Sequence, residues 1–311
     1  MKTTKLFLAI LGVAFAMNVF SQESEQKFKK LNFTRHNNLI TDTKRDRDSI
    51  VAYVRYYYNE KDNHYFYVKD VYEDEKSYRI GYSTLEPSIG ITGLFKQYFV
   101  DKNGEITVSV GEYDANTRIG EWTDFAGDSI LVGKCFFDNE GKKTGHWQTW
   151  YESGQSKDDE HFVDGNPHGK CLYYFDNGQL AAEELYKNGE LIDYKLFDEA
   201  GNQVIRENYE PMEMPAYKGG NEKMMNFLSQ NIIYPQEALK QGIQGTVVVY
   251  FIVKPNGELT DMKVIKSVHL DLDNEALRVV KLMDGKWNAG MLHNQKVYVS
   301  FSLPVKFKLR K

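Results

Sequence analysis

A repeat of 24 to 27 residues occupies the middle of this sequence and constrains its fold more than any other feature. Each copy begins with a glycine that precedes aromatic residues. These glycines are Gly93, Gly120, Gly145 and Gly169, and a decayed fifth copy starts at Asp193. A second aromatic column with nearly the same spacing consists of Tyr113, Phe137, Phe162 and Tyr186. Because so short a unit cannot bury its aromatic face alone, the copies must stack around a shared core.

Turn dipeptides divide each copy into two short strands. They are Asn103-Gly104, Ser153-Gly154, Asn177-Gly178 and Asn188-Gly189. Asn-Gly is typical of β-hairpins, because both residues tolerate a positive φ. We therefore predict a stacked hairpin array over residues 93–205. One ladder of its core is predicted to consist of Phe95, Trp122, Trp147 and Cys171.

These repeats resemble the MORN-like repeat arrays of bacterial proteins. The resemblance implies that the array is a surface for binding or spacing. The alternative is a pure scaffold, in which the aromatic columns only pack the core. Residues 22–92 are also rich in aromatic residues. We predict a β region there, formed either by degenerate copies of the repeat or by a cap.

The composition limits the classes of function. Lys and Arg number 39 and Asp and Glu number 44, so the net charge is −5 and the pI is near 5.9. A general nucleic-acid binder needs a basic surface, so this class is excluded. A hydrophobic content of 41% is typical of globular proteins, and 311 residues allow about two domains.

The N-terminus has the pattern of an export signal. Lys2 and Lys5 precede the apolar run 6–17, which is shorter than the ~20 residues of a comfortable membrane span. We predict a signal peptide over residues 1–21 and a mature chain outside the cytoplasm. An uncleaved short anchor is the alternative.

No constellation of catalytic residues is recognisable in the sequence. The histidines and acid nearest to one another are His146, His161, His168 and Asp164, and they lie on separate predicted turns. Zinc needs three or four converging ligands, so we predict no metal, no cofactor and no enzymatic activity. Cys135 and Cys171 are predicted to be small buried hydrophobic residues, with a disulfide as the alternative.

The pattern changes in the last hundred residues. Prolines and the Gly219-Gly220 pair indicate a linker over residues 206–220. A domain over residues 221–311 follows, with a predicted helix at 222–230 and an amphipathic helix from 272 to 283. Its predicted strands, rich in β-branched residues or alternating in hydrophobicity, are 246–253, 258–268 and 297–309.

Several spaced motifs of this domain resemble the TonB C-terminal domain. They are Tyr234-Pro235, Gly242-Ile243-Gln244-Gly245, Asn256-Gly257, Leu272-Asp273, Glu275-Ala276-Leu277-Arg278, Trp287 and Leu303-Pro304-Val305-Lys306-Phe307. Where the family has Pro-Gly after the tryptophan, this chain has Ala289-Gly290. The resemblance implies a periplasmic α+β domain with a three-stranded antiparallel sheet and two to three helices. The predicted fold class is thus mainly β plus α+β: a hairpin array followed by a TonB-like domain.

The last strand is the predicted binding site. Pro304 has no N–H and is tolerated mainly on an edge strand, and Tyr298, Ser300 and Ser302 share its open side. An open edge accepts an extended segment of a partner, although Pro304 could simply protect the edge. In the family, the partner segment is the TonB box of outer-membrane transporters. Tyr234 and Pro235 complete the predicted partner-binding set.

Two functions follow from these observations. The first is a TonB-like protein that binds a TonB-dependent outer-membrane receptor and supports energy-dependent transport, with inner-membrane motor proteins as further partners if the N-terminus is an anchor. The alternative is a non-transducing scaffold of the cell envelope. In that case the MORN-like surface binds a ligand and the C-terminal domain only forms a homodimer.

Overall fold

The computed structural model describes residues 29–33, 53–59, 65–101, 103–127 and 129–309. The chain divides into two compact units, Met1–Lys195 and Leu196–Lys311. The predicted signal peptide lies outside the described residues. Among the helices that the structure describes, none is both long and apolar enough to cross a bilayer.

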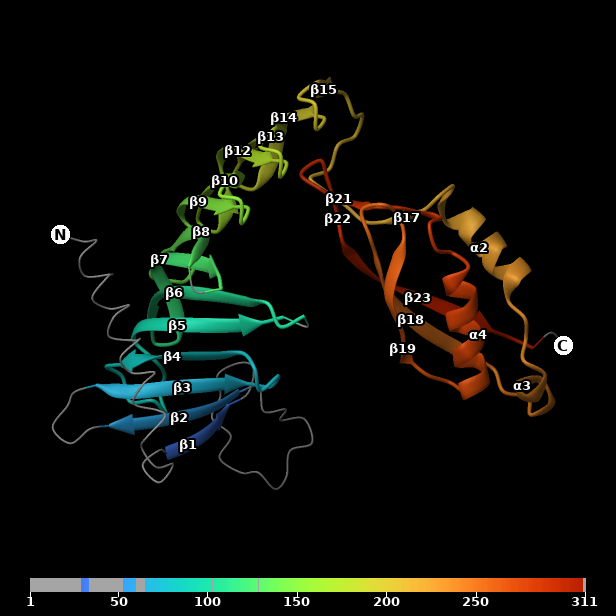
Figure 1. Cartoon of the computed structure of the whole chain (residues 1–311), viewed down its shortest axis with the longest axis horizontal. Helices are drawn as coiled ribbons and strands as arrows, with labels where there is room; N and C mark the ends of the chain where they lie inside the picture. Colours follow the sequence, from blue (N-terminus) through green and yellow to red (C-terminus); the bar gives the residue numbers. More distant parts are fainter. Residues whose placement is uncertain (1–28, 34–52, 60–64, 102, 128, 310–311) are drawn as a thin grey trace. The chain divides into compact units, whose positions relative to one another are not determined.

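The first large sheet follows chain order, so each strand pairs with the strands next to it in sequence (Figure 1). Its strands are β1 (Lys29–Phe33), β2 (Tyr53–Asn59), β3 (Phe66–Tyr72), β4 (Tyr78–Ser83), β5 (Gly93–Val100), β6 (Ile106–Asp114), β7 (Thr117–Ala126), β8 (Ile130–Phe137), β9 (Gly145–Trp150), β10 (Ser156–Val163), β11 (Asn166–Pro167), β12 (Gly169–Tyr174), β13 (Leu180–Lys187), β14 (Glu190–Phe197) and β15 (Gln203–Val204). Only β11 leaves this order, because it pairs with β10 beside the main path. The predicted stacked hairpins are confirmed, while the resemblance to MORN-like repeats stays a prediction.

Two kinds of turn join these strands. At Asn188-Gly189 both residues have a positive φ, as expected for Asn-Gly. At Asn177-Gly178 only the glycine does, with φ 84°. There the Asn177 side chain accepts the backbone N–H of Gln179 at 2.9 Å, so an Asx turn replaces the expected geometry.

Aromatic residues of the repeats build the array core. Phe95 and Trp122 are fully buried in one cluster, and Trp147 packs against it. A Cβ on Gly111 would lie 2.2 Å from the Trp122 ring, so only glycine fits beneath that ring. Cys135 and Cys171 are buried free thiols, which confirms the prediction of small hydrophobic residues. Burial raises the pKa of the Cys135 thiol to about 12.

The early strands contain a buried ionic triad that the sequence analysis missed. Arg55 donates two hydrogen bonds to Asp70, at 2.7 and 2.9 Å. Arg79 donates a third to the same carboxylate at 2.7 Å. All three side chains are nearly or completely buried. One carboxylate therefore holds two guanidinium groups inside the array.

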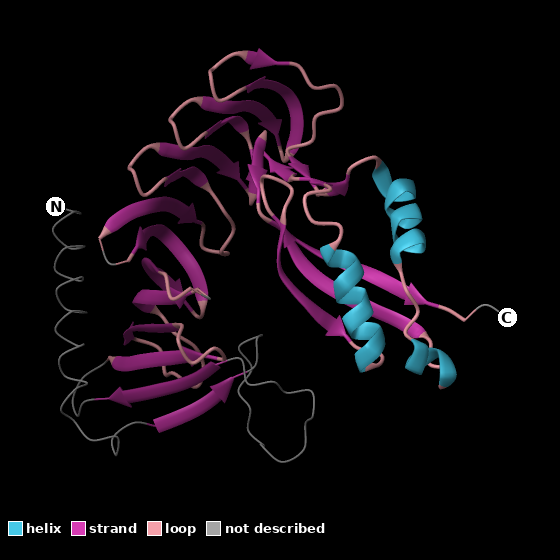
Figure 2. Ribbon diagram, turned by 45° about the vertical axis from the view of Figure 1, so that its right-hand side comes forward, coloured by secondary structure: helices cyan, strands magenta, loops and turns pink. Residues whose placement is uncertain are grey.

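The second unit has three small sheets and three described helices. Its elements are β16 (Met212–Glu213), β17 (Ala216–Tyr217), α2 (Gly220–Asn231), α3 (Gln236–Lys240), β18 (Gly245–Val253), β19 (Leu259–Lys266), α4 (Leu270–Lys281), β20 (Trp287–Asn288), β21 (Gly290–Leu292), β22 (Gln295–Val297) and β23 (Val299–Phe307). The antiparallel sheet β19-β18-β23 and the helices beside it (Figure 2) share one apolar core. The predicted α+β fold class is confirmed.

The segment predicted as a linker, 206–220, is part of this fold. Its strand β16 pairs with β21, and β17 pairs with β20. The buried Tyr217 ring lies perpendicular to that of Trp287, with 5.8 Å between the centroids. Strands of two residues carry too little periodicity to be distinguished from a loop in the sequence.

Candidate partner-binding edge

Strand β23 forms one edge of the three-stranded sheet. It pairs with β18 alone in this sheet, from Gly245↔Phe307 to Val253↔Val299, and the register is unbroken over nine residue pairs. An edge strand presents one row of backbone N–H and C=O groups to a partner. A regular register keeps these groups evenly aligned along the strand.

The position of Pro304 shows which residues face outward. Pro304 lies opposite Val248 and has no N–H to give to β18, so this pair is a non-hydrogen-bonded one. Residues of the same parity, Ser300 and Ser302, therefore also direct their backbone groups away from β18. Their side chains and that of Pro304 are exposed, and Tyr298 just before the strand is 68% exposed.

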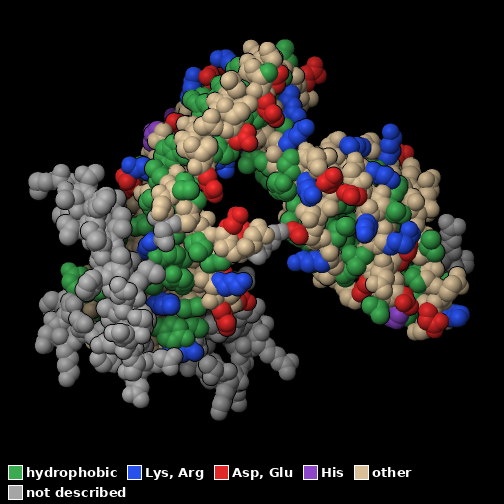
Figure 3. Space-filling model, in the orientation of Figure 1, with side chains coloured by type: hydrophobic (Ala, Val, Ile, Leu, Met, Phe, Trp, Pro, Cys, Tyr) green, Lys and Arg blue, Asp and Glu red, His purple; other side chains and the backbone are tan. Residues whose placement is uncertain are grey.

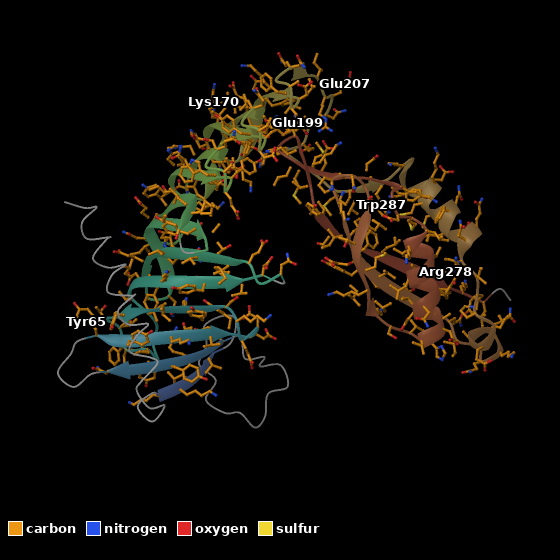
Figure 4. The ribbon with its side chains drawn as sticks, viewed as in Figure 1. Tyr65, Lys170, Glu199, Glu207, Arg278 and Trp287 are labelled. Carbon is orange, nitrogen blue, oxygen red and sulfur yellow. The ribbon has the colours of Figure 1, made fainter. Side chains whose placement is uncertain are left out.

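The opposite parity anchors β23 to the domain. Leu303, Val305 and Phe307 are buried in the apolar core. Phe301 packs on Trp287, with 5.1 Å between ring centroids. Trp287, labelled in Figure 4, is 2% exposed and fills the space between β23 and β17. One face of β23 thus packs on the core and holds the strand, while its other face stays exposed.

Tyr234, predicted together with Pro235 as part of the partner-binding set, contacts the end of β23. The Tyr234 ring is perpendicular to that of Phe307 at 5.9 Å, and its hydroxyl donates to the carbonyl of Ile243. Phe307 belongs to the buried parity of β23, so these contacts are on the core side. Through these contacts Tyr234 supports the end of the strand, and its part in binding a partner stays a prediction.

An ion pair that the sequence analysis did not single out fixes the segment before α3. The carboxylate of Glu275, 8% exposed, accepts the backbone N–H of Ile233 at 2.6 Å. It also accepts two hydrogen bonds from Arg278, at 2.7 and 2.8 Å. Arg278, labelled in Figure 4, donates to the carbonyl of Asn231 as well. The hydrogen bonds to Glu275 raise the pKa of Arg278, and the bonds to Ile233 and Asn231 tie α4 to the segment that carries Tyr234.

The opposite edge of the sheet is a poorer template. Strand β19 pairs with β18 through two register irregularities. Asp261 within it has φ 55°, a conformation that interrupts an extended strand. Bulges of this kind turn an edge away from further pairing. Of the two edges, β23 is therefore the one suited to a guest strand.

The histidines weighed as metal ligands in the sequence have other partners in the structure. In the part of the chain that the structure describes, no group of three His, Cys, Asp or Glu residues is placed to hold an ion. The nitrogen Nε2 of His146 pairs instead with Asp159 at 2.6 Å. The nitrogen Nδ1 of His168 accepts the backbone N–H of Asn188 at 3.4 Å.

Comparison with known families agrees with this geometry. Residues 230–309 match the family described as the C-terminal domain of Gram-negative bacterial TonB proteins. The second unit contains a TonB C-terminal domain. This membership supports a TonB-like role in energy transduction in the cell envelope.

Two solved structures are similar to a part of the chain. Both are solution NMR structures of the Helicobacter pylori TonB C-terminal domain. The first has 26% identity, covers 29% of this chain and 80% of its own, and has a TM-score of 0.25. The second has 25% identity, covers 29% and 94%, and has a TM-score of 0.23. A comparison with curated proteins found no match.

Proposed function

We propose that this protein is a TonB-like protein of the periplasm that binds an extended segment of a TonB-dependent outer-membrane receptor. The segment would add to the sheet along β23 and so support energy-dependent transport across the outer membrane. The observation that carries this proposal is the regular, outward-facing row of backbone groups on β23, set against the irregular edge of β19.

Strand addition suits a partner of variable sequence. Hydrogen bonds between main chains supply affinity, and alternate side chains of the guest supply specificity. The buried residues Leu303, Val305 and Phe307 fix β23 in place. Little conformational entropy of β23 is therefore lost when the guest binds. A domain with this edge acts by binding, and we propose no catalytic step for it.

We propose that the hairpin array serves as a folded spacer. Each strand of the array pairs with its sequence neighbours, so a load passes from one hairpin to the next along the sheet. Backbone hydrogen bonds and the aromatic core resist this load together. The array would link the C-terminal domain to whatever fixes the N-terminal end.

Replacing Ser300 with proline tests the proposed edge. Ser300→Pro removes an N–H that faces outward, so pairing with β18 is preserved, as it is at Pro304. We expect at least a tenfold loss of affinity for a synthetic TonB-box peptide, measured by calorimetry on the full chain. Ser300→Ala, which keeps the N–H, is the matched control and should bind as the unmodified chain does. Equal binding by the proline and alanine variants, both folded by circular dichroism, would refute strand addition at β23.

A further inference from the structure

The exposed row of β23 continues beyond the start of the strand. Side chains of even-numbered residues are exposed without interruption from Lys296 to Lys306, and those of the odd-numbered residues between them are at least partly buried. This alternation passes through Tyr298, the single residue between β22 and β23. The two strands therefore keep one parity and present a single row.

The backbone follows the same parity. Strands β21 and β22 are joined by a two-residue turn, in which His293 and Asn294 have φ of 47° and 64°. Such a turn is closed by a hydrogen-bonded pair, here Leu292 and Gln295. The odd-numbered residues of β22 thus face β21, just as those of β23 face β18. The outer edge is continuous from residue 296 to residue 306.

Strands β21 and β18 flank this edge from the same side. An added Cβ on Gly290 of β21 would lie 2.5 Å from the Val299 side chain, and Val299 pairs with Val253 of β18. Both neighbours therefore meet the chain at residues 297–299 on its inner side. No described residue pairs with the outer side of either strand.

The charges on this row sit at its two ends. Lys296 and Lys306 are exposed, with Lys308 exposed two residues beyond Lys306, and the residues of the row between Lys296 and Lys306 are uncharged: Tyr298, Ser300, Ser302 and Pro304. At ~3.3 Å per residue the two lysines are about 33 Å apart, beyond the Debye length of ~8 Å, so each acts independently. Figure 3 shows Lys and Arg scattered over the visible face of this unit rather than gathered in one patch.

We propose that this edge selects guest segments with a carboxylate at each end, about ten positions apart, and uncharged residues between. The proposal rests on strand addition at β23 and extends it to β22. Side chains directly opposite across a strand pair have Cβ atoms ~4.5–5.5 Å apart, so opposite charges there stabilise the pair. The same lysines disfavour self-pairing. If two copies paired antiparallel over the whole edge, Lys296 would oppose the partner copy's lysine at position 306.

Charge reversal at both ends tests the selection. The probe is an eleven-residue synthetic peptide with glutamate at both ends and alternating valine and threonine between. We expect Lys296→Glu with Lys306→Glu to bind it about tenfold more weakly, since each exposed ion pair contributes ~0.2–1 kcal/mol. A peptide with lysine at both ends should reverse the preference. The control is Lys263→Glu with Lys266→Glu on the β19 edge, which should leave the affinity for the acidic peptide unchanged.

Failure of the selection can be separated from failure of the edge. If Ser300→Pro abolishes binding of the acidic peptide while reversal of the two lysines changes nothing, the charge selection is wrong and strand addition stands. If Ser300→Pro has no effect either, both proposals fall. The β19 control could weaken binding as much as the reversal at residues 296 and 306. In that case the peptide is attracted by the overall charge of the domain, and the proposed alignment of its carboxylates with Lys296 and Lys306 is wrong.

Discussion

The two units of this protein use antiparallel strands in opposite ways. In the array the pairings join strands that are adjacent or, for β10 and β12, nearly adjacent in sequence, whereas the C-terminal unit pairs β18 with β23 and β16 with β21, which are far apart in the chain. Each core nonetheless contains a buried tryptophan, Trp122 or Trp287, whose indole nitrogen has no hydrogen-bond partner among the described residues. In each, a tyrosine ring lies nearly perpendicular to that tryptophan.

This difference in contact range predicts a difference in cooperativity. An array of neighbouring contacts can lose one hairpin while distant hairpins persist, because each repeat depends mainly on those beside it. A domain closed by long-range pairings loses them together. The following changes test that contrast, starting with the largest expected effect.

The largest effect is expected at the buried triad of the array. Asp70→Asn leaves Arg55 and Arg79 buried without their carboxylate, which should cost about 3–5 kcal/mol of unfolding free energy. The exposed triad Lys170–Glu183–Lys195 has the same arrangement of one acid between two bases. Glu183→Gln should therefore cost less than about 1 kcal/mol. Urea unfolding followed by tryptophan fluorescence measures both.

The strands in which Asp70→Asn reduces protection from hydrogen exchange test the contrast between the two units. We expect hydrogen exchange to accelerate in β2–β4, while the C-terminal unit keeps its protection. Equal acceleration in both units would show that the array and the C-terminal unit unfold together. The proposed difference in cooperativity between them would then be wrong.

A smaller effect is expected at Glu275 of the C-terminal unit, which pairs with Arg278 in the same helix and accepts a long-range hydrogen bond from Ile233. Glu275→Gln weakens the bonds to Arg278 and Ile233 and should cost about 2 kcal/mol. The loss should spread from α4 to the end of β23, because Tyr234 follows the released segment and packs on Phe307. Hydrogen exchange of β23 reports it. Glu237→Gln, whose partner Lys240 is exposed, is the control, and a response at β23 there would contradict the assignment.

Sequence periodicity predicted those features that repeat or alternate. The 24-residue spacing was enough for the stacked hairpins, and the parity of Pro304 was enough for the outward row of β23. The strands at 212–217 were missed, because pairs of residues carry no period. The Arg55–Asp70–Arg79 triad was missed because its members are spread over three strands and resemble ordinary surface charges. The contacts of Tyr234 with Phe307 and Ile243 could not be predicted, because a family motif gives no direction to a side chain.

The smallest effect is expected at a turn that both units share. Asn177 accepts the N–H of Gln179 at 2.9 Å, Asn256 accepts that of Glu258 at 3.0 Å, and the next residue in each turn is a glycine with φ 84°. Replacing either asparagine with alanine removes one such bond and should cost about 1 kcal/mol. Both variants lose this backbone hydrogen bond, so the spread of its effect can be compared. Hydrogen exchange should quicken in β12 and β13 alone for Asn177→Ala, but throughout the sheet β19-β18-β23 for Asn256→Ala. An equally local response in both variants would mean that the range of contacts does not set cooperativity in this protein.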